Sequence, residues 1–274
     1  VWTGAFLAGA FLVLSVNAYY ILRNRHLEIA KPAFRIALVV AAFFSLFQLF
    51  SGHQSAEGVA KNQPAKLAAM EGHFDSSARA DMFLLGWVDK EKQQSTGIRI
   101  PGGLSFLLHQ DMKAPVTGLN AFKKEDQPSQ INAVFQFYHL MVGIGMLLIA
   151  LTLYALWSWK KGTLFQQRWL LHVFAWSVLL PQIANQAGWF TAEMGRQPWV
   201  VYGLLRTSDA LSATVKAEQV LVSLILFTLV YATLFVLFLY LLNKKIKHGP
   251  VHHADENTAF SMRNNPMMQS SENQ

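Results

Sequence analysis

Residues 133–157 read AVFQFYHLMVGIGMLLIALTLYALW, and this apolar run decides the fold class of the chain. It contains no Asp, Glu, Lys or Arg over its whole length. A helix that crosses the hydrocarbon layer of a bilayer needs about 20 consecutive, mostly apolar residues. The run is long enough, so we predict a transmembrane α-helix here.

Four further apolar runs approach or exceed the same length. They cover residues 1–22, 34–50, 169–189 and 220–242. The chain is 53% hydrophobic and only 14% charged, as expected for a protein embedded in lipid. We therefore predict an all-α integral membrane protein. It is a bundle of about five transmembrane helices with a long, partly helical extracytoplasmic loop between the second and third.

Clusters of Lys and Arg orient the predicted helices. They follow the first, third and fifth runs, as Arg23, Arg25, Lys31 and Arg35, then Lys160, Lys161 and Arg168, then Lys244, Lys245 and Lys247. Alternating spans put all three clusters on one side, and the positive-inside rule makes that side cytoplasmic, with the long loop outside. The net charge of +7 follows from this topology. The basic residues form no single patch with interleaved aromatics, so we predict no nucleic-acid partner.

The predicted spans divide the chain into four parts. Residues 1–51 hold two transmembrane helices, residues 52–131 form the outer loop, residues 132–248 hold three more helices, and residues 249–274 read as a polar, disordered cytoplasmic tail. Loops of this length usually carry function, and this one includes a helical stretch at 63–72. The chain opens inside an apolar run with no polar leader, so we expect Val1 to be the start of a fragment.

The absence of cysteine restricts the possible cofactors. Disulfides, iron–sulfur ligation and the C-x-x-C-H attachment of c-type haem are excluded. A metal or haem must then be held by His, Met, Glu, Asp or Tyr. His248, His252 and His253 cluster near the C-terminus, but a flexible tail lacks the preorganisation of a metal site.

The stretch 181–199, PQIANQAGWFTAEMGRQPW, brings polar side chains to the outer end of the fourth span. Gln182, Gln186, Trp189 and Glu193 are spaced by 4, 3 and 4, so they share one face of a helix, and Arg196 extends that face if the helix continues. Ionisable groups near membrane depth mark functional sites by default. Glu193 is open to three interpretations: a structural ion pair with Arg196, a proton relay, or an iron ligand.

Two candidate ligands lie near the start of the third span. His139 and Met141 are two residues apart, so a regular helix points them about 200° apart and they cannot bind the same metal. Met141 lies beside the small residues Gly143 and Gly145, which permit close approach of a flat cofactor. A Met that fills a gap in the core, and a hydrogen-bonded His at the interface, are the simpler interpretations.

Lys66 and Glu71 lie five residues apart in the helical part of the loop. On a solvated helix they are an ordinary pattern of surface charge. On a loop that lies against the membrane, the carboxylate could accept a proton from a lipid-soluble reductant while the ammonium holds its oxygen.

Together these residues resemble subunit I of the cytochrome bd quinol oxidases, in its C-terminal half and in the branch with a short quinol loop. The resemblance rests on islands in the same order along about residues 1–250. They are KLAAME at 66–71, IRIP at 98–101, APVTGL at 114–119, YHLMVG at 138–143 and GWFTAEMGRQPW at 188–199. The last string is long and highly specific.

The resemblance implies roles for individual residues. Met141 would be an axial ligand of a low-spin haem b, and Glu193 the protein ligand of a high-spin haem b. Trp189, Arg196 and His139 would line the haem sites, with Arg suited to pair with propionates. Lys66 and Glu71 would serve quinol oxidation in the loop. The third cofactor would be haem d.

The resemblance also implies what surrounds the chain. The intact enzyme would sit in the bacterial cytoplasmic membrane, oxidise quinol at the outer face and reduce O2 to water without pumping protons. Its other parts would be the N-terminal half of subunit I, subunit II and a small single-helix subunit, all in contact with lipid. Two other classes remain open: a membrane transporter with a polar intramembrane path, and a non-catalytic scaffold subunit.

Overall fold

The computed structural model describes residues 2–212 and 214–250. It divides into two units, Val1–Ser212 and Ala213–Gln274, and each is described by itself. Most of the predicted disordered tail, with His252 and His253, lies outside the described residues. The second unit contributes one long helix, α8 (Ala217–His248).

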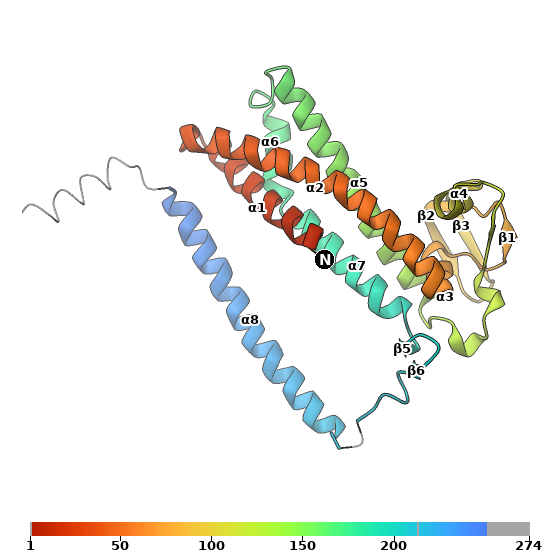
Figure 1. The fold of residues 1–274 in the computed structure, drawn as a ribbon. Coiled ribbons are helices and arrows are strands. Elements are labelled where there is room, and N and C mark those ends of the chain that lie inside the picture. Colours follow the sequence, from red (N-terminus) through yellow and green to blue (C-terminus); the bar gives the residue numbers. More distant parts are fainter. Residues whose placement is uncertain (1, 213, 251–274) are drawn as a thin grey trace, which may run out of the picture. The chain divides into compact units, whose positions relative to one another are not determined.

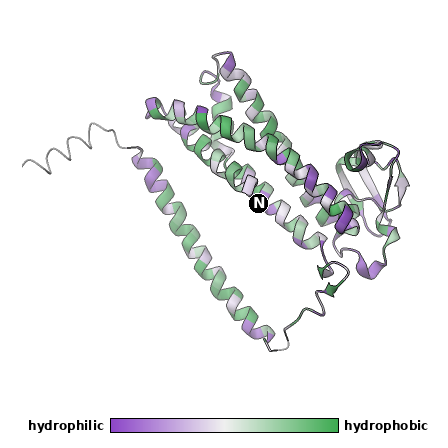
Figure 2. Cartoon of the chain, in the orientation of Figure 1, coloured by the Kyte–Doolittle hydropathy of each residue, from purple (hydrophilic) through white to green (hydrophobic). Residues whose placement is uncertain are grey.

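The first unit is built around five helices that pack side by side (Figure 1). They are α1 (Trp2–Leu22), α2 (Leu27–Asn62), α5 (Ile131–Lys160), α6 (Arg168–Trp176) and α7 (Leu179–Gly195). α1 packs against α2, α6 and α7, and α5 packs against α7 and α2. Apolar residues dominate the length of the helices, and hydrophilic residues gather toward their ends (Figure 2).

Among the described residues, four helices are long and apolar enough to cross a membrane. They are α1, α2, α5 and α8. The prediction of a mostly helical membrane protein is therefore confirmed. The runs at 34–50, 133–157 and 220–242 each lie in one of these helices, as does the first run from Trp2 onward. The helix that contains the second run continues to Asn62, well beyond the apolar residues that predicted it.

The fourth predicted span, 169–189, is not one helix. It is divided between α6 and α7, with a break at Ser177 and Val178. Pro181 explains the position of the break, because proline has no N–H to donate and its ring clashes with the carbonyl of the residue four positions earlier, here Ser177. Both break residues keep right-handed helical dihedral angles, so the chain is kinked rather than turned back.

The loop between α2 and α5 is partly helical, as predicted, but it also contains strands. Its elements are α3 (Pro64–Glu71), β1 (Ser77–Ala78), β2 (Met82–Asp89), β3 (Gln94–Ile100), α4 (Gly103–His109), β4 (Pro115–Val116) and two short 3-10 turns, Leu119–Ala121 and Lys124–Asp126. β1 pairs with β4 and β2 with β3, all antiparallel. After α7, β5 (Trp199–Val201) pairs with β6 (Leu205–Arg206).

Two of the three basic clusters lie at the same end of the first unit. The Arg35 guanidinium carbon is 5.6 Å from the ring centroid of Trp159, which directly precedes Lys160. Lys31 and Arg35 both lie over the ring of Phe165, at 5.8 and 5.3 Å. The loop elements gather at the opposite end of the helices (Figure 1).

Aromatic packing holds the basic end of the first unit together. Phe11, Phe34 and Phe174 are completely buried and come from α1, α2 and α6. The Phe34 ring meets Phe174 edge-on at 5.2 Å between centroids, and Phe11 lies 6.4 Å from Phe174. Edge-to-face contacts of this kind add to the effect of burial.

We expect Phe34→Ala to lower the thermal midpoint of the solubilised complex strongly, because a buried Phe→Ala change costs about 3–5 kcal/mol. Phe50→Ala is the matched control, since Phe50 lies on the same helix and is 59% exposed. Equal losses in the two variants would contradict the assignment of Phe34 to the core.

Candidate functional site

The short helix α3 lies between α5 and α7 and sends one ionisable side chain to each of them. Pro64 at its first position presets the helical dihedral angle, and Gly72 ends the helix with a positive φ of 61°. Six of its eight residues are buried. The interpretation of Lys66 and Glu71 as an ordinary solvated pair is therefore wrong.

Glu71, at the end of α3, is buried, with only 1% of its surface exposed. It packs beside α5, where the Tyr138 hydroxyl donates a hydrogen bond to its carboxyl group. The second carboxyl oxygen, Oε2, is buried and has no hydrogen-bond partner in the part of the chain that the structure describes. Burial disfavours the charged form and raises the pKa of Glu71 to about 7, while the Tyr138 hydrogen bond opposes that rise. The carboxyl group is thus able to exchange a proton near neutral pH.

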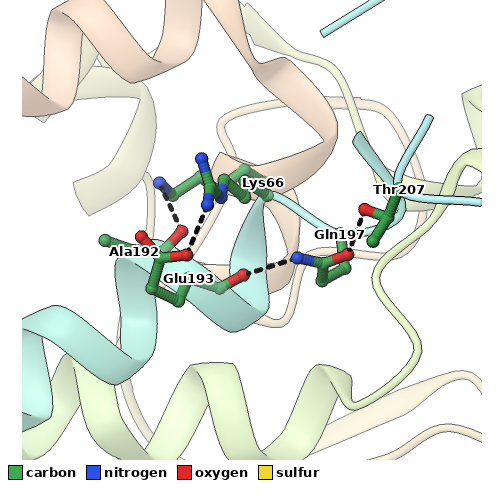
Figure 3. Close-up of polar contacts among 6 residues, drawn as sticks. Lys66, Ala192, Glu193, Gln197 and Thr207 are labelled. Carbon is green, nitrogen blue, oxygen red and sulfur yellow. Dashed lines mark hydrogen bonds and ion pairs between the residues drawn. The ribbon is translucent and has the colours of Figure 1, made fainter. Parts of the chain in front are cut away.

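Lys66 points toward α7 instead (Figure 3). Its Nζ donates to the carbonyl oxygen of Ala192 at 3.2 Å, and its stem lies against Gly195, where a Cβ would be 3.1 Å from the Lys66 Cγ. The last carbonyls of a helix lack partners within the helix and favour a cation. Burial first, and then the charge of Arg196, lower the pKa of Lys66, while Glu193 opposes the shift.

Glu193 forms an ion pair with Arg196, which is one of the three interpretations that its sequence position allows. Arg196 Nη2 lies 2.6 Å from Glu193 Oε2, and both side chains are partly exposed. Gln197 Nε2 donates to the Glu193 carbonyl oxygen at 3.4 Å, and Thr207 donates to Gln197 Oε1 at 2.7 Å, so the end of α7 is tied to the segment that follows (Figure 3). These contacts hold the Glu193 carboxylate at the end of α7. The other two interpretations of Glu193, as a proton relay or as an iron ligand, stay open.

Met141 on α5 faces α7 at Gly188. A Cβ on Gly188 would lie 2.7 Å from the Met141 sulfur, so only glycine allows the thioether to lie there undisturbed. On α5, nothing lies within 4 Å of a Cβ built on Gly143 or Gly145. Met141 therefore lies half-buried between the two helices, beside open space along α5.

His139 is directed away from Met141. Its Nε2 lies 2.8 Å from the carbonyl oxygen of Phe83 in β2, and its Nδ1 lies 2.8 Å from the carbonyl oxygen of Phe135. A carbonyl oxygen only accepts, so a ring nitrogen that carries a proton donates to the carbonyl oxygen that it faces. His139 joins the loop to α5, and its predicted contact with a cofactor stays a prediction.

The polar face predicted on α7 is present and uncovered by the described residues of this unit. Gln182, Gln186 and Trp189 are exposed along it, and it ends at Glu193. Near that end two donors, Arg196 Nε and Trp199 Nε1, are buried with no hydrogen-bond partner among the described residues. Unpaired buried donors are costly, so an acidic group of a ligand fits here.

The donor set suits a porphyrin better than a bare metal ion. Within the part of the chain that the structure describes, no three His, Asp or Glu side chains gather in a metal-binding group. Met141 and Glu193 instead offer one thioether and one carboxylate from neighbouring helices. A haem brings four nitrogen ligands of its own and needs only such axial groups, while its propionates suit unpaired Arg and Trp donors.

Two residues near Glu71 had no role in the sequence analysis. Tyr138, which bonds Glu71, stands in the string YHLMVG, but nothing in its spacing indicates a partner 67 residues earlier. His73 follows Gly72, and its Nε2 is buried without a partner among the described residues. Burial lowers the pKa of His73, against the opposing effects of a backbone hydrogen bond at Val116 and of Asp75 and Asp81.

The fold and the site define a helical, multi-span membrane protein with a thioether, a carboxylate and a buried acid at one end of its helices. Residues 1–250 match the family described as cytochrome bd terminal oxidase subunit I, and the chain belongs to that family. The resemblance drawn from the sequence islands is thereby confirmed.

Curated relatives and a solved structure agree. The chain is 37% identical to a putative cytochrome bd menaquinol oxidase subunit I and 32% identical to cytochrome bd ubiquinol oxidase subunit 1, both of Bacillus subtilis (strain 168), over 94% and 91% of this chain. These matches cover 58% and 55% of the relatives, so the chain spans a little over half their length. The bd oxidase structure from Geobacillus thermodenitrificans has a TM-score of 0.79 at 27% identity, over 90% of this chain and 56% of that one.

Glu71 makes stability depend on pH. Its pKa is about 7 in the folded chain against an ordinary value of 4.5, so the stabilising effect of its proton is complete below about pH 4.5 and is lost as pH rises through 7. At about 1.4 kcal/mol per pH unit the loss approaches about 3 kcal/mol. We expect Glu71→Gln to raise the thermal midpoint relative to the parent at pH 8.5 but hardly at pH 5.

Glu91→Gln is the control for this pH comparison, because Glu91 is an exposed acid in the turn between β2 and β3. It should leave the midpoint unchanged at both pH values. A Glu71→Gln effect that is the same at pH 5 and pH 8.5 would mean that Glu71 is not buried as a neutral acid.

Proposed function

We propose that this chain is the part of a membrane terminal oxidase that oxidises quinol at the outer face and carries axial ligands for two haems b. One observation carries the proposal: α3 packs against both α5, which holds Met141, and α7, which holds Glu193. On α3, the buried acid Glu71 has an oxygen with no partner among the described residues. A quinol gives up two protons and two electrons to become a quinone. Four electrons and four protons reduce O2 to two waters.

In this proposal the chain's own residues bind the cofactors and move protons. Met141 would be an axial ligand of a low-spin haem b, and Glu193 the protein ligand of a high-spin haem b. Arg196 would hold a propionate through its unpaired Nε, with Trp189 and His139 nearby on the family pattern. Bound haems b and d would supply one-electron transfer and the reduction of O2.

Glu71 would act as the proton acceptor for quinol. A pKa of about 7 leaves a useful fraction ionised at neutral pH, and Oε2 has no competing partner among the described residues. Lys66 would place a positive charge beside Glu193 and Arg196, where it stabilises negative charge arriving at that site. The ammonium and the carboxyl group thus serve different parts of the site rather than holding one oxygen together.

The location in the membrane follows from the same proposal. The two basic clusters at one end of the first unit would face the cytoplasm, and the loop with α3 the outside. Quinol protons would then be released outside while O2 reduction takes protons from the cytoplasm. The resulting charge separation needs no pump. The N-terminal half of subunit I, subunit II and a small single-helix subunit would complete the complex.

We expect Met141→Leu to remove the low-spin haem b signal from the reduced-minus-oxidised spectrum of the assembled complex, because leucine has no thioether to bind iron. Met146→Leu is the matched control: Met146 lies on the same helix, is exposed, and should tolerate the change. An unchanged spectrum in Met141→Leu would refute the assignment.

We expect Glu71→Gln to slow quinol oxidation at least tenfold while the haem content stays at the parent level, because removing a positioned acid or base costs about 10²–10⁴-fold in rate. Loss of haem in parallel with activity would make Glu71 a structural residue.

Tyr138→Phe should shift the pH dependence of the rate to higher pH, since the hydrogen bond that lowers the pKa of Glu71 is lost.

A further inference from the structure

The β2–β3 hairpin runs alongside the outer end of α5 in a regular order. Lys90 Nζ donates to the Ser129 carbonyl oxygen at 2.9 Å, just before the helix. One turn on, the Val88 N–H donates to Asn132 Oδ1 at 3.2 Å, and then Gln136 Nε2 donates to the Gly86 carbonyl oxygen at 2.8 Å.

The last contact in this order is His139 with the Phe83 carbonyl oxygen, at 2.8 Å. As the strand runs backward from residue 90 to residue 83, its partners on α5 run forward from 129 to 139. The hairpin is therefore fixed in depth along the helix by four contacts.

The two faces of the hairpin differ sharply. The inner face carries the glycine pair Gly86 and Gly97 and the buried Val88, and it packs on Phe135 and on the end of α3. Ser95 Oγ donates to the Gly72 carbonyl oxygen at 2.5 Å, so the hairpin also holds the residue after Glu71.

The outer face is apolar and exposed. Leu85 pairs with Ile98 across the strands, and Trp87 pairs with Thr96 on the same face. Leu85, Trp87 and Ile98 are 66%, 63% and 62% exposed. The charged residues of the hairpin lie in its turn, residues 89–92, at the end farthest along the order of contacts from His139, and at Arg99. Arg99 follows Ile98 in β3, so strand alternation turns its side chain to the other face, and it pairs with Asp81.

The depth of this face follows from the length of α5. Trp157 and Lys160 mark its basic end, and a hydrocarbon layer of about 30 Å takes up about 20 residues of helix. Counting about 20 residues back from Trp157 reaches the region of Gln136 and His139, the residues that hold β2. The apolar outer face is therefore level with the boundary between hydrocarbon and headgroups, while the charged turn projects beyond it.

We propose that the outer face of the β2–β3 hairpin, formed by Leu85, Trp87 and Ile98, is a membrane-interface anchor that contacts lipid of the outer leaflet. Tryptophan is enriched at this level because its ring is apolar and its N–H is polar. The anchor holds the end of α3 at the membrane surface through Ser95 and Gly72. The anchor depends on the hairpin and on the position of α5 in the membrane, and it does not depend on haem or quinol.

Site-directed spin labelling tests the anchor, because the chain has no cysteine of its own. Leu85→Cys, Ile98→Cys and Lys92→Cys would be labelled in the full complex reconstituted into phospholipid vesicles, with the unsubstituted complex as background. We expect labels at 85 and 98 to collide with O2, which partitions into lipid, several-fold more than with a water-soluble nickel chelate. The label at 92, where the side chain is 77% exposed, should show the opposite preference.

Two outcomes would overturn the anchor. Immobile labels at 85 and 98 that neither reagent reaches would mean that another protein segment covers the face. Labels that the nickel chelate reaches as readily as position 92 would put the face in water. Thr96→Cys lies on the same face and replaces an exposed side chain, so it keeps the test decisive if the apolar substitutions reduce assembly.

Discussion

The N-terminal end of α5 is the surface on which the rest of the site is assembled. One side of its first turns is polar and meets the backbone of β2 through Asn132, Gln136 and His139. The other side is apolar and meets α3 through Val134 and Phe135, with Tyr138 reaching Glu71. Because both sides are used at once, the loop has a single position relative to the helix. That single position is what keeps a carboxyl group buried and incompletely paired.

Burial of this kind is costly, and the cost has a chemical use. A buried carboxyl group destabilises the folded chain when it is ionised and one of its oxygens lacks a hydrogen bond. Glu71 is such a group among the described residues. The nearby Lys66 and Arg196 hold positive charge at the end of α7, where the Glu193 carboxylate and the helix dipole balance it. Perturbed groups gathered at one end of a helical bundle are typical of a functional site.

The long helices could be predicted from the sequence, because the thickness of the bilayer sets the length of the apolar run that a spanning helix needs. The helix at 63–72 and the pairing of Glu193 with Arg196 could also be predicted, since both depend only on short-range spacing. The sequence analysis predicted one continuous helix over 169–189, although Pro181 is a signal for the kink at Ser177. The strands were missed because MFLLGWV at 82–88 has no strict alternation, and a bulge between Phe83 and Leu85 interrupts the register.

The long-range part of the site could not be predicted from spacing. Lys66 reaches Ala192 across 126 residues, and Glu71 meets Tyr138 across 67. Only the folded loop brings these partners together. The opposite directions of Lys66 and Glu71 were likewise hidden, because a separation of five residues on a helix leaves the two side chains on different faces.

A pyridine haemochrome spectrum of the purified membrane complex that contains this chain tests the central claim most directly. The claim is that the polar groups at the outer ends of α5 and α7 bind iron porphyrins. It predicts the bands of haem b together with those of haem d. A complex that contains the whole protein and shows no Soret absorption would contradict it and would favour a polar transport path along α7.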